Sequence, residues 1–387
     1  MKITAIICEY NPFHKGHLLQ ISQLKKNNDT VICIMSGGFV QRGEPALFDK
    51  YDRAKAAVLC GADIVFELPF PFSCSAAEFF AFGGVSLANS LNVVDKLCFG
   101  SENGDIEKLK KVSKNINSPE FKKALSDARS DKDNSNVPFA YLRENIYRST
   151  YGQDFPVLPN DILGIEYINA LTKLKSDIEP FTYKRQKGFS ATESRRLLFE
   201  ENSFEMIPEN VRYVFEDSER YEMKYAERAI LSYYRSADTK ELKKYEGMSN
   251  GLAEKMVKGA RETSSLDGLM EYLSGKSYTN ARIKRAVING IIGTLPEMVK
   301  CRPLYTSVLA ASDNGRKLLR QITKISDIDI LTKPAHFKKL SGKGKEQALL
   351  SQKADSFLTL MCKEAKESDY FLKQKPYIHI TKGENQQ

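Results

Sequence analysis

The sequence predicts an α/β fold: a Rossmann-like domain with a doubly wound parallel sheet over residues 1–200, then a basic all-helical domain over residues 201–387. Three observations predict it. Short apolar runs alternate with helical patterns in the first half. After Leu198 the strand pattern stops, and apolar residues recur every three to four positions. Positive charge gathers in the second half, where residues 276–350 hold 15 Lys and Arg against 5 Asp and Glu.

Short apolar runs bounded by turn residues predict the strands of the first half. The expected strands are, in order, Ile3–Glu9, Val31–Met35, Asp63–Leu68, Val94–Phe99 and Ile178–Lys184. Helical patterns lie between them at 18–24, Tyr51–Leu59, Ser75–Leu91 and Ile162–Leu171. Strands joined by helices form parallel sheets, which bind ligands beyond the carboxyl ends of their strands. We therefore expect functional residues in the loops that follow the strands.

Apolar spacing of three to four residues predicts the helices of the second half. They are expected at Lys224–Tyr234, Gly251–Thr263, Leu266–Tyr272, Thr279–Ile292 and Tyr305–Leu319. The positive charge there is explained either by a solvated surface or by nucleic-acid binding.

Composition excludes several classes of protein. With 387 residues and 42% apolar side chains, the chain can build a full core. No run of 18 apolar residues occurs, so we expect no membrane span, and the first apolar run lacks a signal-peptide cleavage site. The seven cysteines form no C-x-x-C pair, and no His/Cys cluster has the spacing of a metal site. A cytoplasmic protein without a structural metal is expected.

Two of the four histidines lie three residues apart in the loop after the first strand, Asn11-Pro12-Phe13-His14-Lys15-Gly16-His17. Pro12 ends the strand, and Gly16 allows a close approach of backbone to ligand. A helix that starts here presents its amide groups to an anion, and two imidazoles can donate hydrogen bonds to a phosphate in the transition state. The alternative is a pair of surface histidines in a loop. The H-x-G-H pattern at this place resembles the class I nucleotidyltransferase family, which attacks the α-phosphate of ATP and expels pyrophosphate.

A second candidate lies after the strand at 178–184. Ser190 and Thr192 begin a helix with hydroxyls next to its first amides, and Arg195 follows. Class I nucleotidyltransferases carry a Ser/Thr-rich turn with a following Arg or Lys near the triphosphate, so the resemblance implies a phosphate-binding role for these three residues. The alternative is an ordinary helix cap with a solvated arginine.

Five further blocks narrow the resemblance. They are E-Y-N-P-F-H-K-G-H at 9–17, M-S-G-G-F-V-Q-R-G-E-P-A at 35–46, G-A-D-I-V-F-E-L-P at 61–69, F-G-S-E at 99–102 and L-P-N-D-I-L-G-I-E-Y at 158–167. In this order they resemble the bacterial tRNA(Met) cytidine acetate ligase family. The resemblance implies an enzyme that activates acetate with ATP to acetyl-adenylate. It then acetylates the 4-amino group of the wobble cytidine of elongator tRNA(Met), with Mg²⁺ accompanying the triphosphate and no protein partner implied.

The resemblance also implies the residues of an ATP site. They are Ile7, Cys8, Glu9, Tyr10, Asn11, Pro12, Phe13, His14, Lys15, Gly16, His17, Leu18, Leu19, Gln20, Gly100, Asn160 and Arg185. His14 and His17 are the catalytic candidates. Arg42, in the glycine-bearing loop after the second strand, is an anion contact candidate on the acetate or tRNA side. Two departures from the family stand out: Asp161 replaces a second amide after Asn160, and only residues 186–189 separate Arg185 from Ser190.

The basic second half is expected to hold the tRNA by phosphate contacts. The candidates for tRNA binding are Lys276, Tyr278, Arg282, Lys284, Arg285, Arg316, Lys317 and Arg320. Two other functions remain open from the residues alone. A small-molecule adenylyltransferase would share the histidine chemistry without needing the basic half, and a non-catalytic RNA-binding protein would keep a decayed nucleotide site.

Overall fold

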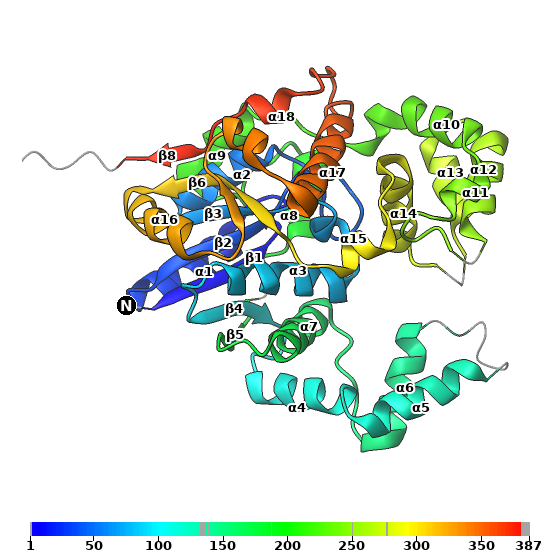
Figure 1. Ribbon diagram of the computed structural model, residues 1–387, viewed down its shortest axis with the longest axis horizontal. Helices are drawn as coiled ribbons and strands as arrows, with labels where there is room; N and C mark the ends of the chain where they lie inside the picture. Colours follow the sequence, from blue (N-terminus) through cyan, green and yellow to red (C-terminus); the bar gives the residue numbers. More distant parts are fainter. Residues whose placement is uncertain are drawn as a thin grey trace, which may run out of the picture.

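An eight-stranded sheet forms the centre of the molecule (Figure 1). A computed structural model describes residues 2–131, 137, 139–186, 188–249, 251–275 and 278–380. The strand order is β5-β4-β1-β2-β3-β6-β7, with β8 beside β6. The strands are β1 (Ile3–Cys8), β2 (Thr30–Ser36), β3 (Ile64–Leu68), β4 (Lys96–Ser101), β5 (Glu179–Lys184), β6 (Tyr305–Ser312), β7 (Asp329–Leu331) and β8 (Tyr377–His379).

The first five strands are all parallel, from Ile3 opposite Thr30 in β1 and β2 to Lys96 opposite Glu179 in β4 and β5. The chain builds β1, β2 and β3 outward and then returns to place β4 on the other side of β1. The order therefore reverses between β1 and β4, and such a switch point opens a crevice at the carboxyl ends of the strands. The predicted parallel α/β sheet is confirmed.

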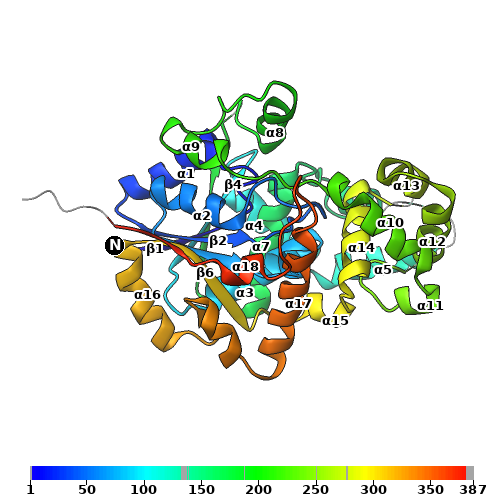
Figure 2. The same cartoon turned by 90° about the horizontal axis from the view of Figure 1, so that it is seen from above.

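Helices cover both faces of the sheet (Figure 2). Because successive strand residues point to opposite faces, Ile32 and Ile34 of β2 join the core under α3, while Cys33 and Met35 join the core under α1 and α2. The first-half helices are α1 (Lys15–Lys26), α2 (Lys50–Leu59), α3 (Ala77–Ser90), α4 (Ile106–Ile116), α5 (Pro119–Ser130), α6 (Phe139–Tyr151), α7 (Pro159–Leu174) and α8 (Ala191–Glu200).

A separate helical unit lies to one side of the sheet, drawn in green and yellow in Figure 1. Its apolar core gathers residues such as Tyr234, Leu252, Leu269 and Val287, and this core continues into the loops after β2 and β3 through Phe39 and Phe70. The helices after α8 are α9 (Arg212–Glu216), α10 (Glu227–Ser236), α11 (Thr239–Leu242), α12 (Leu252–Glu262), α13 (Leu266–Leu273), α14 (Asn280–Ile292), α15 (Pro296–Lys300), α16 (Asp313–Ile325), α17 (Gly342–Leu358) and α18 (Tyr370–Lys373).

One expectation about the second half is wrong. The predicted helix over Tyr305–Leu319 is instead β6 followed by α16, and β7 and β8 also join the sheet, so the second half is not wholly helical. The β6 sequence YTSVLAAS is buried on both faces, with Val308 in the core under α3 and Leu309 in the core under α1 and α2. A short run that is apolar on both faces has no period to separate a strand from a helix.

Buried ion pairs join elements from the first part of the chain to a helix near its end. Lys50 of α2 bonds Glu67 of β3 and Asp355 of α17, each at 2.7 Å, and all three side chains lie largely out of solvent.

Within the described residues, no helix combines the length and apolarity that a membrane crossing would need.

Candidate active site

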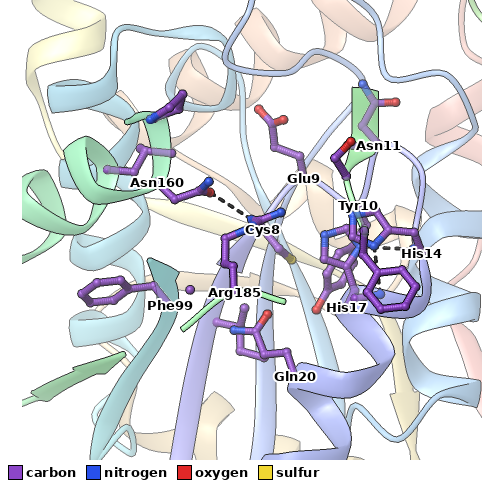
Figure 3. A pocket seen from close by; sticks show the side chains of 18 of the residues that line it. Cys8, Glu9, Tyr10, Asn11, His14, His17, Gln20, Phe99, Asn160 and Arg185 are labelled. Carbon is purple, nitrogen blue, oxygen red and sulfur yellow. Dashed lines mark hydrogen bonds between the residues drawn. The ribbon is translucent and has the colours of Figure 1, made fainter. Parts of the chain in front are cut away.

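A cavity of about 330 Å³ opens at the carboxyl ends of β1 and β4, where the strand order reverses (Figure 3). Its lining includes these predicted residues: Ile7, Cys8, Glu9, Tyr10, Asn11, His14, Gly16, His17, Leu19, Gln20, Gly100, Asn160, Arg185, Ser190, Thr192 and Arg195. Four predicted residues are not part of the lining, namely Pro12, Phe13, Lys15 and Leu18. Phe13 is fully buried and supports the site from below, with its ring 5.6 Å from that of His17.

The two histidines cap the first turn of α1 by bonding to backbone amides. The Nδ1 atom of His14 accepts from the Gly16 amide at 3.1 Å, and the Nδ1 atom of His17 accepts from the His14 amide at 3.2 Å. An imidazole nitrogen that accepts such a bond carries no proton, so the proton of each neutral ring sits on Nε2. The rings stack with centroids 3.7 Å apart. The local structure therefore sets both tautomers and makes each Nε2 a donor.

The surroundings keep both histidines neutral. Burial, followed by the charges of Arg185 and Arg195, lowers the pKa of His14 to about 3. Burial, then His14 and Arg185, lowers the pKa of His17 well below its usual value. The His14 Nε2 atom is buried and has no hydrogen-bond partner among the residues that the structure describes, an arrangement that costs free energy unless a ligand accepts the bond. Sequence reasoning left surface histidines as the alternative; His14 is instead 1% exposed.

The buried His14 gives the stability of the protein a pH dependence. The unfolded chain protonates His14 near pH 6.5, but the folded chain does so only near pH 3. The stabilising contribution is complete above pH 6.5 and is lost as the pH falls towards 3. When the pH falls from about 7 to about 5, we expect the protonation of His14 in the unfolded chain to lower the free energy of unfolding by about 2 kcal/mol. Urea denaturation at both pH values should show a His14→Asn variant losing about 2 kcal/mol less than the wild type; equal losses would contradict a neutral buried ring.

The wall opposite the histidines is built by β4, β5 and the start of α7. Asn160 donates through Nδ2 to Glu102 at 2.6 Å and accepts from Arg185 at 3.0 Å, so its amide orients the guanidinium. A methyl group on Gly100 would stand 2.9 Å from the Arg185 side chain and 3.0 Å from the Tyr183 hydroxyl. Glycine at this strand end therefore leaves room for both side chains.

Asp161, the first departure from the family pattern, has a structural explanation. Its carboxylate accepts from the Glu102 amide at 3.0 Å and from Asn103 Nδ2 at 2.7 Å. Glu102 in turn accepts from the amides of Asn160 and Asp161 at 3.2 and 2.9 Å. The two carboxylates hold the loop after β4 against the first turn of α7, which fixes Asn160 in the wall.

The start of α8 closes the third side of the cavity. The Ser190 hydroxyl caps the helix and accepts a hydrogen bond from the Glu193 amide at 3.1 Å. This is the ordinary helix cap that the sequence offered as the alternative to a phosphate-binding role. Arg195 lies one turn along and donates to the Asn11 carbonyl at 2.7 Å, which joins α8 to the histidine loop. Ser190, Thr192 and Arg195 all line the cavity, so the shortened segment before them still brings this turn to the site.

A tight loop after β2 forms the fourth side and carries residues that sequence reasoning only partly identified. Gln41, Arg42 and Glu44 line the cavity. Arg42 had been singled out as an anion contact, whereas Gln41 and Glu44 had not; the glycines around them were the available signal. The Gln41 amide donates to Glu9 Oε1 at 2.8 Å, which anchors the loop to the end of β1.

Two predicted tRNA-binding residues hold this loop from behind. Lys284 of α14 pairs with Glu44, and Arg285 donates to the Gln41 carbonyl at 2.9 Å. A side chain at Gly43, where φ is +78°, would collide with the backbone of Lys284 and Arg285. The helical unit therefore supports the cavity wall directly, and these two cations have a structural role that the sequence pattern did not indicate.

The other described candidates for tRNA binding lie in two separate places, one at the start of α14 and the other on α16. Arg282 of α14 stacks on the ring of Tyr278, 4.7 Å from its centroid. Arg316, Lys317 and Arg320 lie on α16, which begins where Ser312 donates to the Asp63 carbonyl just before β3. That is the amino-terminal edge of the parallel strands, opposite the cavity. Lys276 lies outside the described residues.

Apolar residues complete the lining. Phe80, Phe99, Leu163, Tyr167 and Phe189 contribute to it, and periodicity alone marks such residues only as core. Within the part of the chain that the structure describes, no three His, Cys, Asp or Glu side chains are grouped so as to hold a metal ion. The cavity thus joins an apolar floor to neutral and cationic donors, a combination suited to a nucleotide with its phosphates.

Comparison with known proteins agrees with this geometry. The family model of the HIGH nucleotidyl transferases matches residues 1–371. A tRNA(Met) cytidine acetate ligase of Clostridium perfringens is 37% identical over 363 residues, which cover 86% of this chain and 90% of the relative. The Clostridium acetobutylicum ligase is 34% identical over 376 residues, with 86% and 90% covered. The crystal structure of Thermotoga maritima TmcAL bound with alpha-thio ATP superposes with a TM-score of 0.91 at 30% identity, over 98% of this chain and 100% of that one.

Proposed function

Because this chain belongs to the tRNA(Met) cytidine acetate ligase family of HIGH nucleotidyl transferases, we propose that it activates acetate with ATP and acetylates the wobble cytidine of elongator tRNA(Met). One observation carries the proposal: two stacked, neutral imidazoles present Nε2 donors at a cavity that also holds Arg185 and Arg195. This set can bind a phosphate and stabilise it further when its charge grows.

In the first step an acetate oxygen attacks the α-phosphorus of ATP, and pyrophosphate leaves. His14 and His17 donate to the equatorial oxygens of the five-coordinate transition state. Because both rings are neutral, they act through directed hydrogen bonds and leave the ionic contribution to Arg185, Arg195 and the Mg²⁺ that enters with ATP. The unpartnered His14 Nε2 atom fits this role, since a preorganised donor needs no rearrangement when charge develops.

In the second step the 4-amino group of the cytidine attacks the acetyl carbon of acetyl-adenylate, and AMP leaves. A wobble base lies in a loop, so it enters the cavity without the cost of opening a base pair. The mixed anhydride hydrolyses readily, and the partly enclosed cavity protects it until the base arrives. A tRNA substrate implies that the enzyme works in the cytoplasm.

The tRNA contacts are electrostatic in this proposal. Arg282 on α14 and Tyr278 just before this helix lie on the unit that supports the cavity wall. Arg316, Lys317 and Arg320 form a second cluster at the edge opposite the cavity, for parts of the tRNA away from the wobble base. Because each neutralised phosphate releases counterions, we expect tRNA affinity to fall more than about tenfold between about 50 and 200 mM salt. Filter binding measures the slope, and Arg282→Gln should reduce it by about one. An affinity that does not change with salt would contradict these assignments.

ATP–pyrophosphate exchange with a panel of carboxylic acids tests the activity. We expect exchange that depends on acetate, together with a mass increase of one acetyl group in the anticodon fragment of elongator tRNA(Met). Exchange without any carboxylic acid would favour a small-molecule adenylyltransferase. Tight tRNA binding without exchange would favour a non-catalytic RNA-binding protein. Either result would overturn the proposal.

A further inference from the structure

The second step of the proposed reaction needs a group that accepts a proton. The cytidine 4-amino nitrogen carries a proton too many once it has bonded to the acetyl carbon, and it must lose that proton for the amide to form. Neither histidine can accept this proton in the observed arrangement, because each Nδ1 atom accepts a hydrogen bond from a backbone amide and each Nε2 atom is already protonated.

Among the described residues that line the cavity, only Glu9 and Glu44 carry carboxylates. Glu44 is paired with Lys284 at the back of the loop. Glu9 follows β1 directly, and only its Oε1 atom is bonded, to the Gln41 amide at 2.8 Å. Within the described part of the chain, its Oε2 atom has no hydrogen-bond partner. Figure 3 shows the Glu9 side chain standing between Asn160 on one side and Asn11 on the other.

The Glu9 backbone is fixed as firmly as its side chain. Its carbonyl accepts from the guanidinium of the buried Arg53 at 2.6 Å. The next residue, Tyr10, is a buried tyrosine with φ of +47°, a conformation that persists only where the surrounding structure enforces it. The carboxylate is therefore held in place before any substrate binds.

We propose that Glu9 is the general base of acetyl transfer, a role that rests on the proposed function. The cytidine nitrogen forms a bond to the acetyl carbon, and the bond from that carbon to the AMP phosphate oxygen breaks. The electron pair of the broken bond leaves with AMP, and the proton of the nitrogen passes to Glu9 Oε2. Glu9 releases this proton to solvent when acetylated tRNA and AMP depart, so the enzyme is restored and the charges balance.

The charges around Glu9 suit this role. A carboxylate beside a triphosphate is unfavourable unless nearby cations compensate its charge. Burial raises the pKa of Glu9, while the Gln41 amide and then Arg195, Arg42 and Arg53 oppose the rise. A carboxylate with a raised pKa is a stronger base, and the nearby cations keep it ionised when the tRNA arrives.

The Glu9→Gln variant tests the proposal because glutamine keeps an acceptor for the Gln41 amide and loses the base. Because Glu9 also lines the ATP cavity, the test compares two losses in the same variant. One is the loss of the first step, measured by acetate-dependent ATP–pyrophosphate exchange and by acetyl-hydroxamate formation in the presence of hydroxylamine; the other is the loss of acetyl transfer to tRNA. Hydroxylamine needs no help from a base to trap acetyl-adenylate. Single-turnover acetyl transfer to tRNA should fall at least about 100-fold more than exchange does. The wild-type transfer rate should also decline as the pH drops through the pKa of Glu9, and the variant should lack this decline.

Three results would overturn the proposal. Acetyl transfer at the wild-type rate in Glu9→Gln would show that Glu9 only anchors the loop. The same conclusion would follow if Glu9→Ala were inactive in transfer while Glu9→Gln stayed active. Equal loss of exchange and transfer would assign Glu9 to the first step. Recovery of Glu9→Gln by added Mg²⁺ would make it a contact of the metal. A wild-type enzyme without acetate-dependent exchange would instead refute the proposed function itself, so the two failures are distinguishable.

Discussion

A His14→Asn variant is expected to lose about 100- to 1,000-fold in the rate of adenylation and to keep its fold. Asparagine is among the best helix caps, and its side-chain oxygen can accept the Gly16 amide that His14 Nδ1 accepts now. It cannot reach the position of the Nε2 atom, which is the buried donor without a partner. The substitution therefore removes one donor to the transition state and leaves the start of α1 intact.

Acetate-dependent exchange under saturating ATP measures the loss, and thermal denaturation at pH 8 checks the fold. His14→Gln is the matched variant, because its amide nitrogen extends to the region of Nε2 while its cap is poorer. We expect it to keep more activity and less stability than His14→Asn. If His14→Asn were as active as the wild type, the imidazole would serve only as a cap, and the proposed role of the histidine pair in catalysis would be wrong.

The sequence predicted the elements that carry strong local signals. The parallel strands and the helices at 251–263, 266–272 and 279–292 lie within a few residues of their expected places. The H-x-G-H pattern was informative because it combines an unusual residue, a glycine and a strand end. In contrast, β6 escaped detection because its pairing with β3 depends on a segment about 240 positions away, which no local window contains.

The roles of single charged residues were the hardest to predict. Lys284 and Arg285 looked like free cations on a helix, and both bond to a loop that is distant in sequence. Asp161 departs from the family pattern, and its carboxylate holds the loop after β4 through bonds to Glu102 and Asn103. Charge and spacing predict that a residue can bind an anion, but only tertiary contacts decide whether an internal partner already occupies it.

Arg53 is the extreme example, and its replacement should have the largest effect on stability. It is fully buried in α2 and donates to the carbonyls of Glu9, Ser36, Gly37 and Phe48, at 2.6, 3.1, 2.5 and 3.0 Å. These carbonyls belong to the last residue of β2, to the segments that follow β1 and β2, and to the loop before α2. An Arg53→Met variant fills similar space and removes this donor from all four carbonyls, of which those of Ser36, Gly37 and Phe48 are buried. We expect the free energy of unfolding to fall by at least about 3 kcal/mol.

Arg196 provides the control for this prediction. It lies on the surface of α8 with 41% of its side chain exposed and pairs with Glu193, Glu200 and Glu201. Despite its three ion pairs, Arg196→Met should leave the urea midpoint almost unchanged, because water screens exposed charges and replaces their partners. Urea denaturation of both variants compares the two. Equal losses of unfolding free energy in the two variants would mean that the carbonyls bind water or new donors when Arg53 is removed. The Arg53 guanidinium would then not be the group that holds the ends of β1 and β2 in place at the site.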